Sequence, residues 1–440
     1  MAGSVFDSPL FSKLFPCGDA GRLFTDAAEI RALMLVEGTL AKVQGELGVI
    51  PVDSAFFIHR ASMECQIDPS GLAVETGQNG VCIPGLVAAF RKAMEAPEHA
   101  QFIHYGATSQ DIIDTGLMLR LRQLLSICST DLKAILLHFA RLAETHADTP
   151  MAARTWGQQA TVTSFGAQVA EWGQPLADLF EELTTLRDAT LMVSLSGAAG
   201  TSSALPLPFE TRAALAKALN LRDPGRSWHT DRNPVLRIAD WLTRLNTALG
   251  KFGADLGLMS QTGIEEITLG SAGSSSTMPQ KQNPVAPASL IALSHQAAGL
   301  RSTLQAGAQQ KQQRDGAAWF TEWLTLPQLC LGAASALVTA KSISASLAPQ
   351  MATMRHGISE TCFAETIAFS LAQQMPLPDA KAAVKSICTE ATTSGTALSV
   401  LTQRHFPTLD IGPLFDPQNQ MGTAPQSARN FASHVSIILS

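Results

Sequence analysis

One stretch of the sequence is long enough to limit what this chain can fold into. From Ser109 to Pro150 it has no helix breaker after Gly116, and its apolar residues recur at the spacing of an α-helix. These residues are Ile113, Leu117, Leu121, Leu124, Leu132, Ile135, Phe139 and Leu142. A helix over this range would be on the order of 50 Å long at about 1.5 Å per residue, which is longer than a compact domain needs. Thr108 or Ser109 is a natural N-cap for it, with Asp111 in the first turn.

Further ranges have the same helical periodicity, and we find no strand pattern. They are 27–47, 161–188 with an expected kink at Pro175, 234–262, 285–311 and 318–349. Because long helices joined by short loops form elongated bundles, the sequence predicts an all-α protein.

The texture of the chain divides it into three segments. Residues 1–110 are short elements broken by Pro and Gly and are expected to form an N-terminal helical domain. Residues 111–350 carry the long helices of a central bundle domain, and 351–440 form shorter, more polar helices of a small C-terminal domain.

The charge of the chain argues against several kinds of partner. The net charge is −6, the chain has one Tyr, and we find no basic stripe, so nucleic acid is not an expected partner. We find no signal peptide and no uncharged apolar run of membrane-spanning length, so we expect no membrane association.

Only 15% of residues are charged, below the roughly 25% of soluble domains, which favours an oligomer over a monomer with an alanine-rich surface.

The cysteines indicate a reducing compartment. The seven residues are widely spaced and form no CxxC pair, which is typical of small buried side chains and of neither a disulfide framework nor a zinc site. We therefore expect a cytoplasmic protein with no metal site.

The segment 270–287, GSAGSSSTMPQKQNPVAP, interrupts the helical pattern. Asn283 followed by Pro284 predicts a helix start, with Asn as N-cap and Pro at the first helical position. The preceding Gly270 to Lys281 is longer than a helix connector needs. A mobile lid that closes over an anion and a disordered linker both fit this composition.

The string SSTMPQKQNP resembles the GSSxMPxKxNP signature of the fumarase/aspartase superfamily, and the resemblance extends over essentially the whole chain. HYGATSQDIIDT at 104–115 and RTWGQQA at 154–160 resemble its first and second substrate-binding regions. Further segments are most similar to one branch, the bacterial 3-carboxy-cis,cis-muconate cycloisomerases. They are SGAAGT, SWHTDR, LGKFGADL and the run QQRDGAAWFTEWLTLP.

The resemblance implies a three-domain helical protomer that forms a homotetramer around a central helix bundle, with each active site shared among three subunits. It implies lactonisation of a tricarboxylate product of aromatic-ring cleavage in the β-ketoadipate route, with no cofactor or metal. The reaction adds a carboxylate across a C–C double bond through an aci-carboxylate dianion. Such a site needs a proton-transfer group and donors around the developing charge.

The resemblance also assigns roles to residues. Ser275, six residues before Lys281, matches the position of the proton-transfer residue, although a Ser in a Ser-rich loop is ordinarily only a loop residue. His104 matches the family position beside the TSxD motif, which is TSQD here, and is either catalytic or structural. The residues expected to bind substrate carboxylates are Thr108, Ser109, Thr155, Gln158, Lys281, Asn283, Arg232 and Arg314.

Departures from the family pattern discriminate between activities. Adenylosuccinate lyases carry THGQH in the second region, and the equivalents of its two histidines are Trp156 and Gln159. A carboxylate leaves without a general acid, so this loss fits a cycloisomerase better than adenylosuccinate lyase. Positions 274, 280, 311 and 313 also depart and leave substrate selectivity open. A third alternative is a structural protein on a retired lyase scaffold, for which Ser275 and Lys281 would have no use.

Overall fold

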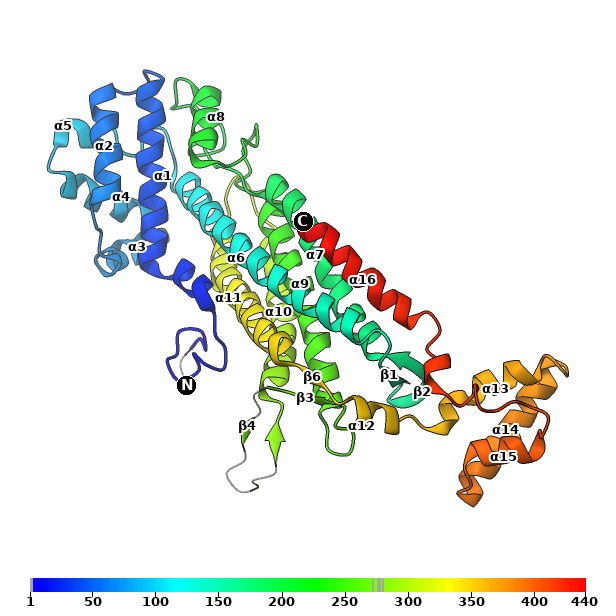
Figure 1. The fold of residues 1–440 in the computed structure, drawn as a ribbon. Helices are drawn as coiled ribbons and strands as arrows, with labels where there is room; N and C mark the ends of the chain where they lie inside the picture. Colours follow the sequence, from blue (N-terminus) through cyan, green and yellow to red (C-terminus); the bar gives the residue numbers. More distant parts are fainter. Residues whose placement is uncertain (1–2, 271–272, 275–277, 279–280) are drawn as a thin grey trace. The chain divides into compact units, whose positions relative to one another are not determined.

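The computed structural model describes residues 3–270, 273–274, 278 and 281–440. Almost all regular structure in this part of the chain is helical, as the periodicity predicted (Figure 1). The five long helices are α6 (Ser109–Thr145), α7 (Phe165–Thr190), α9 (Asn233–Met259), α10 (Val285–Gly307) and α11 (Gly316–Ser346). Their bounds lie within a few residues of the predicted ranges, and α6 begins at the predicted Ser109.

The chain forms two compact units, and every long helix contributes residues to both. The first unit comprises Met1–Asp131, Glu181–Thr247 and Ala292–Val338. The second comprises Leu132–Phe180, Ala248–Ile291 and Thr339–Ser440. The division into domains 1–110, 111–350 and 351–440 stays a prediction.

The first unit contains the N-terminal helices and their apolar core. The helices are α1 (Asp26–Glu46), α2 (Val52–Glu64), α3 (Ala73–Asn79), α4 (Ile83–Met94), α5 (Pro97–Ala100) and α8 (Pro208–Leu219). Thr25 caps α1 by accepting the N–H of Ala28 through its hydroxyl. Leu33, Val36 and Leu40 of α1 are buried against α2, α4 and α8 in one continuous cluster.

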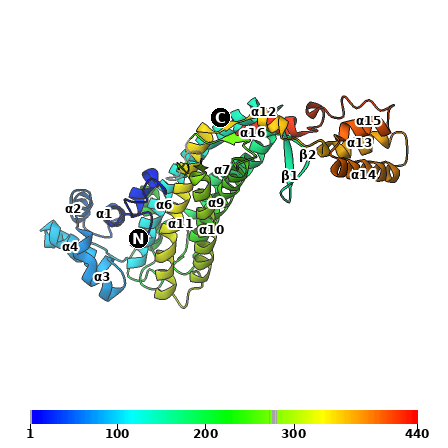
Figure 2. The same ribbon diagram turned by 90° about the horizontal axis from the view of Figure 1, so that it is seen from below.

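The second unit contains the short C-terminal helices. They are α12 (Met351–His356), α13 (Ala364–Leu371), α14 (Leu377–Ser394), α15 (Leu398–His405) and α16 (Ala424–Leu439). Figure 2 shows α13, α14 and α15 side by side, and their buried residues Ile367, Val384 and Leu401 share one apolar cluster.

The expectation of no strands was wrong, since the described residues form three two-stranded sheets, of which two are pairs of two-residue strands. In the longest sheet, the strands β1 (Pro150–Thr155) and β2 (Gln158–Ser164) form an antiparallel hairpin, so residues 161–164 are strand where a helix was predicted. Trp156 and Gly157 both have positive φ (55° and 74°), which is the two-residue type I′ turn that suits a hairpin. The second strand reads QQATVTS, and its Thr and Val side chains favour a pleated strand.

The helix α10 begins at Val285, as the range 285–311 predicted, which is one residue after the first helical position predicted from Asn283-Pro284. The Pro284 carbonyl accepts the Ala288 N–H at 3.0 Å, whereas the Asn283 carbonyl has no donor four residues further on, because residue 287 is a proline. Asn283 is instead the end of β5 (Gln282–Asn283), which pairs with β4 (Gly273–Ser274).

One helix, α11, is longer and more apolar than the sequence analysis expected of any segment. By length and composition alone α11 is long enough to cross a membrane, with a mean hydropathy of 1.4 in its most apolar window. Yet 72% of that window is buried in the protein, as in a core helix, so it is weak evidence for a membrane span.

Candidate active site

The start of α6 is organised by one buried carboxylate. Asp111, the third residue of the helix, accepts the N–H of Thr108 at 3.0 Å, which closes half of a capping box. The same carboxylate accepts hydrogen bonds from the segment 194–197 and from a histidine. These donors are Ser194 Oγ at 3.0 Å, Ser196 N at 2.9 Å, Gly197 N at 2.9 Å and His229 Nε2 at 2.8 Å. Asp111 therefore joins three segments at the place where the first substrate-binding region was predicted.

Next to it lies a buried cluster of charged side chains. Arg232, with a side chain 1% exposed, forms a bidentate pair with Asp114 of α6 and a second pair with Glu322 of α11. Burial lowers the pKa of Arg232, but the charges of Asp114 and Glu322 raise it by more. The pKa of Arg232 is therefore above its ordinary value. Burial and the Asp114 charge raise the pKa of Glu322 against the opposing effect of Arg232. Four of the five N–H donors of Arg232 are occupied, so few remain for a substrate.

Arg314, in the connection between α10 and α11, is placed differently. Its Nε donates to Gln110 Oε1 at 2.8 Å, and its Nη2 makes two longer contacts of 3.3 Å, to Thr108 Oγ1 and to the Ala198 carbonyl. The residue is half-buried. Thr108 and Arg314 were both predicted to bind substrate carboxylates, and the structure brings their side chains together.

His104 lies five residues before α6, on a left-handed backbone with φ of 66°. Its Nδ1 is 2.7 Å from Oε1 of Glu37, which is a buried residue of α1. Burial lowers the pKa of His104, but the charge and hydrogen bond of Glu37 raise it by more, so the pKa is above its ordinary value. The pair lies in the same unit as Thr108 and Arg314.

The other predicted residues lie in the second unit. Thr155 and Gln158 are paired at the end of the β1–β2 hairpin, and both are exposed. Arg154 beside them forms a bidentate pair with the buried Glu266, at 2.7 and 3.0 Å. This pair fixes the outer end of β1.

The two positions that replace the lyase histidines have distinct surroundings. Trp156, at the tip of the hairpin, is 101% exposed. Gln159 donates to the Gly357 carbonyl at 2.8 Å and accepts from Ser359 N at 2.9 Å, and so holds the turn after α12. Gln159 therefore has a structural role in this unit.

The Gly/Ser loop is partly described. Its two ends pair as β4 and β5, and Lys281 N donates to the Met278 carbonyl at 3.0 Å. Lys281 is exposed and Asn283 is half-buried. Ser275 lies outside the described residues.

Of the predicted residues that are described, His104, Thr108, Ser109, Arg232 and Arg314 therefore share one unit and Thr155, Gln158, Lys281 and Asn283 share the other. The sequence did not point to Glu37 or Gln110. Their hydrogen-bond partners, His104 and Arg314, are far from them along the chain. The sequence indicated Asp111 only as an acidic residue in a first helical turn.

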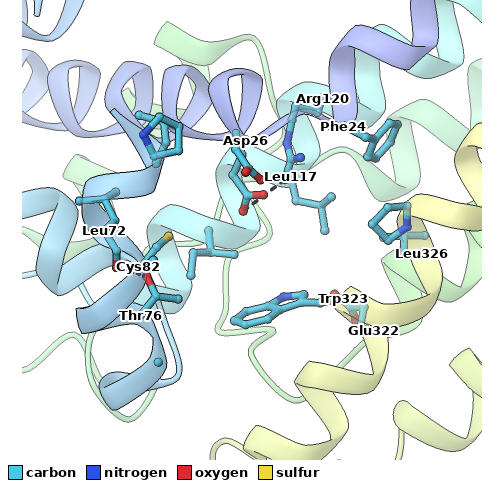
Figure 3. Close-up of a pocket in the computed structure, with 17 residues that line it drawn as sticks. Phe24, Asp26, Leu72, Thr76, Cys82, Leu117, Arg120, Glu322, Trp323 and Leu326 are labelled. Atoms are coloured by element: carbon cyan, nitrogen blue, oxygen red, sulfur yellow. Dashed lines mark hydrogen bonds and ion pairs between the residues drawn. The ribbon is translucent and has the colours of Figure 1, made fainter. Parts of the chain in front are cut away.

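The structure has a cavity of about 600 Å³ that is lined by none of these predicted residues (Figure 3). Its walls are mostly apolar, and Leu72, Leu117, Trp323 and Leu326 are among the residues that form them. Inside it Arg120 pairs with Glu29 at 3.6 Å. Glu322 also lines it, so the buried charge cluster forms part of this wall.

Among the described residues, no group of three or more His, Cys, Asp or Glu side chains could hold a metal ion.

Comparison with known proteins defines the class. A family model described as a lyase matches residues 73–299, just over half of the chain. The chain belongs to this lyase family, within the fumarase/aspartase superfamily.

Relatives within the family are more specific. The chain is 35% identical to 3-carboxy-cis,cis-muconate cycloisomerase of Pseudomonas aeruginosa, over 87% of this chain and 85% of that protein. The solved structure of the 3-carboxy-cis,cis-muconate lactonizing enzyme from Pseudomonas putida superposes with a TM-score of 0.93, at 30% identity, over 98% of this chain and all of that one. An N-acetyl-S-(2-succino)cysteine lyase of Enterococcus italicus is 27% identical over 85% of this chain and 84% of that protein.

Proposed function

We propose that this chain is a 3-carboxy-cis,cis-muconate cycloisomerase, an intramolecular lyase that lactonises its substrate to 4-carboxymuconolactone in protocatechuate degradation by the β-ketoadipate route. Relatives of that name align over 87–95% of the chain at 30–35% identity. The observation that carries the proposal is the replacement of both lyase histidines. Trp156 has no acid group and Gln159 is used to hold a turn. A carboxylate needs no general acid to leave, so the loss of both histidines fits a lactone-forming reaction better than the reaction of adenylosuccinate lyase.

The chemistry balances without an external nucleophile. One substrate carboxylate oxygen bonds to the β-carbon, and the electron pair of the double bond moves to the α-carbon and its carboxylate. The resulting dianion then takes a proton from the Ser275 hydroxyl at the α-carbon. Ser275 regains a proton from water, so one proton is consumed per lactone formed. Main-chain N–H groups and Lys281 would stabilise the transient alkoxide.

The described residues supply places for the substrate's carboxylates. Thr108, Ser109 and the start of α6 offer hydroxyls and N–H groups where the helix dipole favours an anion. Arg314 offers a guanidinium at the same place, and His104, whose pKa is raised by Glu37, remains the second proposed catalytic residue beside Ser275. Thr155, Gln158, Lys281 and Asn283 would complete the site. Between the two arginines, the saturated contacts of Arg232 favour Arg314 as the carboxylate ligand.

We propose further that the protein works as a cytoplasmic homotetramer whose active sites combine residues of three subunits. The low charged fraction and the full exposure of Trp156 at a hairpin tip support burial of surface by other copies. Light scattering coupled to size exclusion should give four times 46.6 kDa.

A direct assay tests the activity. Purified protein is offered 3-carboxy-cis,cis-muconate and adenylosuccinate separately, and loss of the diene absorbance with the first alone is expected. Ser275→Ala should abolish turnover yet elute at the wild-type size. Turnover of adenylosuccinate alone would assign the chain to another lyase activity, and no turnover of either would favour a retired scaffold.

A further inference from the structure

Gln110 is a buried amide with a polar partner on each side. It is 2% exposed, and its Nε2 donates to Asp114 Oδ2 at 3.1 Å and to the His229 carbonyl at 2.9 Å. Its Oε1 accepts from Arg314 Nε at 2.8 Å. The residue therefore connects the buried charge cluster to the candidate carboxylate ligand.

The orientation of this amide is dictated by chemistry. A carboxylate paired with Arg232 and a main-chain carbonyl both accept only, so the NH₂ group of Gln110 must face them. Its carbonyl oxygen must then face Arg314. Rotation of the amide by 180° would place an oxygen against two acceptors and an NH₂ against a guanidinium, so one orientation of the amide is enforced.

The frame behind Gln110 is fixed too. Asp114 receives two hydrogen bonds from Arg232, at 2.8 and 3.0 Å, and Arg232 is held from the other side by Glu322. All three side chains are almost fully buried. A buried and fully paired network of this kind has little freedom to move.

Arg314 presents its outer edge as a consequence. The guanidinium is anchored by one short bond at Nε, while Nη2 makes only the two 3.3 Å contacts. Within the described ranges, Nη1 has no hydrogen-bond partner. An arginine held at Nε and open at its Nη atoms is suited to grip a carboxylate bidentately.

We propose that Gln110 is a positioning residue that aims the Nη edge of Arg314 at one carboxylate of the substrate. That the ligand is a tricarboxylate rests on the proposed function. Gln110 touches no substrate itself, so its whole effect on binding passes through Arg314.

The test is a double-mutant cycle read by calorimetry, with tricarballylate and succinate as probes of tri- and dicarboxylate binding. We expect Gln110→Met to raise the Kd for tricarballylate at least tenfold and that for succinate by less than threefold. Arg314→Met should do the same, and the double variant should bind as weakly as Arg314→Met alone. Independent effects that multiply in the double variant would overturn the proposal, as would equal losses for the two probes.

Two controls separate positioning from general damage. Gln168→Met removes a similar amide, bonded to Asp255 in the second unit, and should leave both Kd values unchanged. If Gln110→Met melts below the assay temperature, Gln110→Asn takes its place, since it keeps an amide but withdraws it from Arg314. The binding cycle does not depend on turnover, so an inactive protein with the expected cycle would contradict the proposed reaction and leave this inference standing. In an active protein, Gln110→Met should raise KM tenfold or more with kcat within threefold.

Discussion

Nδ1 of His104 lies 2.7 Å from Oε1 of Glu37, a side chain that is 1% exposed. His104 is held there on a left-handed backbone, which costs a non-glycine residue free energy. Although burial lowers the pKa of His104, Glu37 raises it above the ordinary value near 6.5. At a given pH, a larger fraction of this imidazole is therefore protonated than of a free histidine.

Replacement of Glu37 by Gln should lower the pKa of His104, measured by NMR titration of its ring. Because the folded pKa is raised, the pair's contribution to the free energy of unfolding is complete below the ordinary pKa and is lost as pH rises through the raised one. Glu37→Gln should therefore destabilise more at pH 6 than at pH 9, by about 1 kcal/mol or more. Glu390→Gln, at the exposed pair with His405, is the control and should show little difference. Equal losses at both pH values would contradict this account of His104.

Removal of Arg232 should damage the fold. Arg232→Met leaves Asp114 and Glu322 buried without their cation, and we expect a loss of about 3–5 kcal/mol in the free energy of unfolding. The loss should shrink as the pH falls, because burial raises the pKa of Glu322 and its carboxyl is then the more readily protonated. Arg244→Met, at an exposed pair with Glu182, should cost less than about 1 kcal/mol in the same urea titrations. A similar small cost for Arg232→Met would refute its structural role.

Substitution by alanine should have opposite effects on the free energy of unfolding at Gly166 and at Gly257. A Cβ at Gly166 of α7 would lie 2.4 Å from the Ala143 carbonyl oxygen and 2.7 Å from Ala147 Cα, which are backbone atoms. Gly166→Ala should therefore cost about 1–3 kcal/mol. Gly257 of α9 has open space at its Cβ, so Gly257→Ala should stabilise by about 0.5–1 kcal/mol through helix propensity. Thermal melts compare the two, and the same sign for both would contradict the packing at Gly166.

The β1–β2 turn can be tested at its two central residues. Gly157→Ala forces a side chain onto a left-handed backbone and should destabilise by about 1 kcal/mol. Trp156→Asn should be neutral or stabilising, because Asn tolerates this conformation better than Trp. Hydrogen exchange of the hairpin amides measures both effects locally. Unchanged protection in Gly157→Ala would argue against a type I′ turn.

Local pattern was enough to predict the long helices. Apolar spacing located α6, and Thr108, Ser109 and Asp111 marked its start, because capping involves neighbours along the chain. The hairpin was missed because 161–164 was read as the start of a helix, although Trp156-Gly157 between β-favouring residues is a turn signal. Periodicity finds faces, and short strands next to a helix are easily absorbed into it.

The candidate site was less accessible to local reasoning. Motifs pointed to Thr108 and Arg314, but their contact joins residues 206 positions apart. Gln110 carried no signal at all, because its role depends on Asp114, His229 and Arg314 meeting around it. Arg232 was predicted as a substrate ligand from its position in a motif, and only the structure reveals how completely Asp114 and Glu322 occupy it.

The five hydrogen bonds that converge on Asp111 affect how related genes are to be interpreted. A descendant that has abandoned chemistry still has to fold, so selection for folding alone would preserve that aspartate. Arg314 is free of such an obligation and would drift once turnover ceased to matter. In a survey of genomes, a relative that retains Asp111 but has another residue in place of Arg314 would be expected to keep the fold and to have lost the catalytic activity.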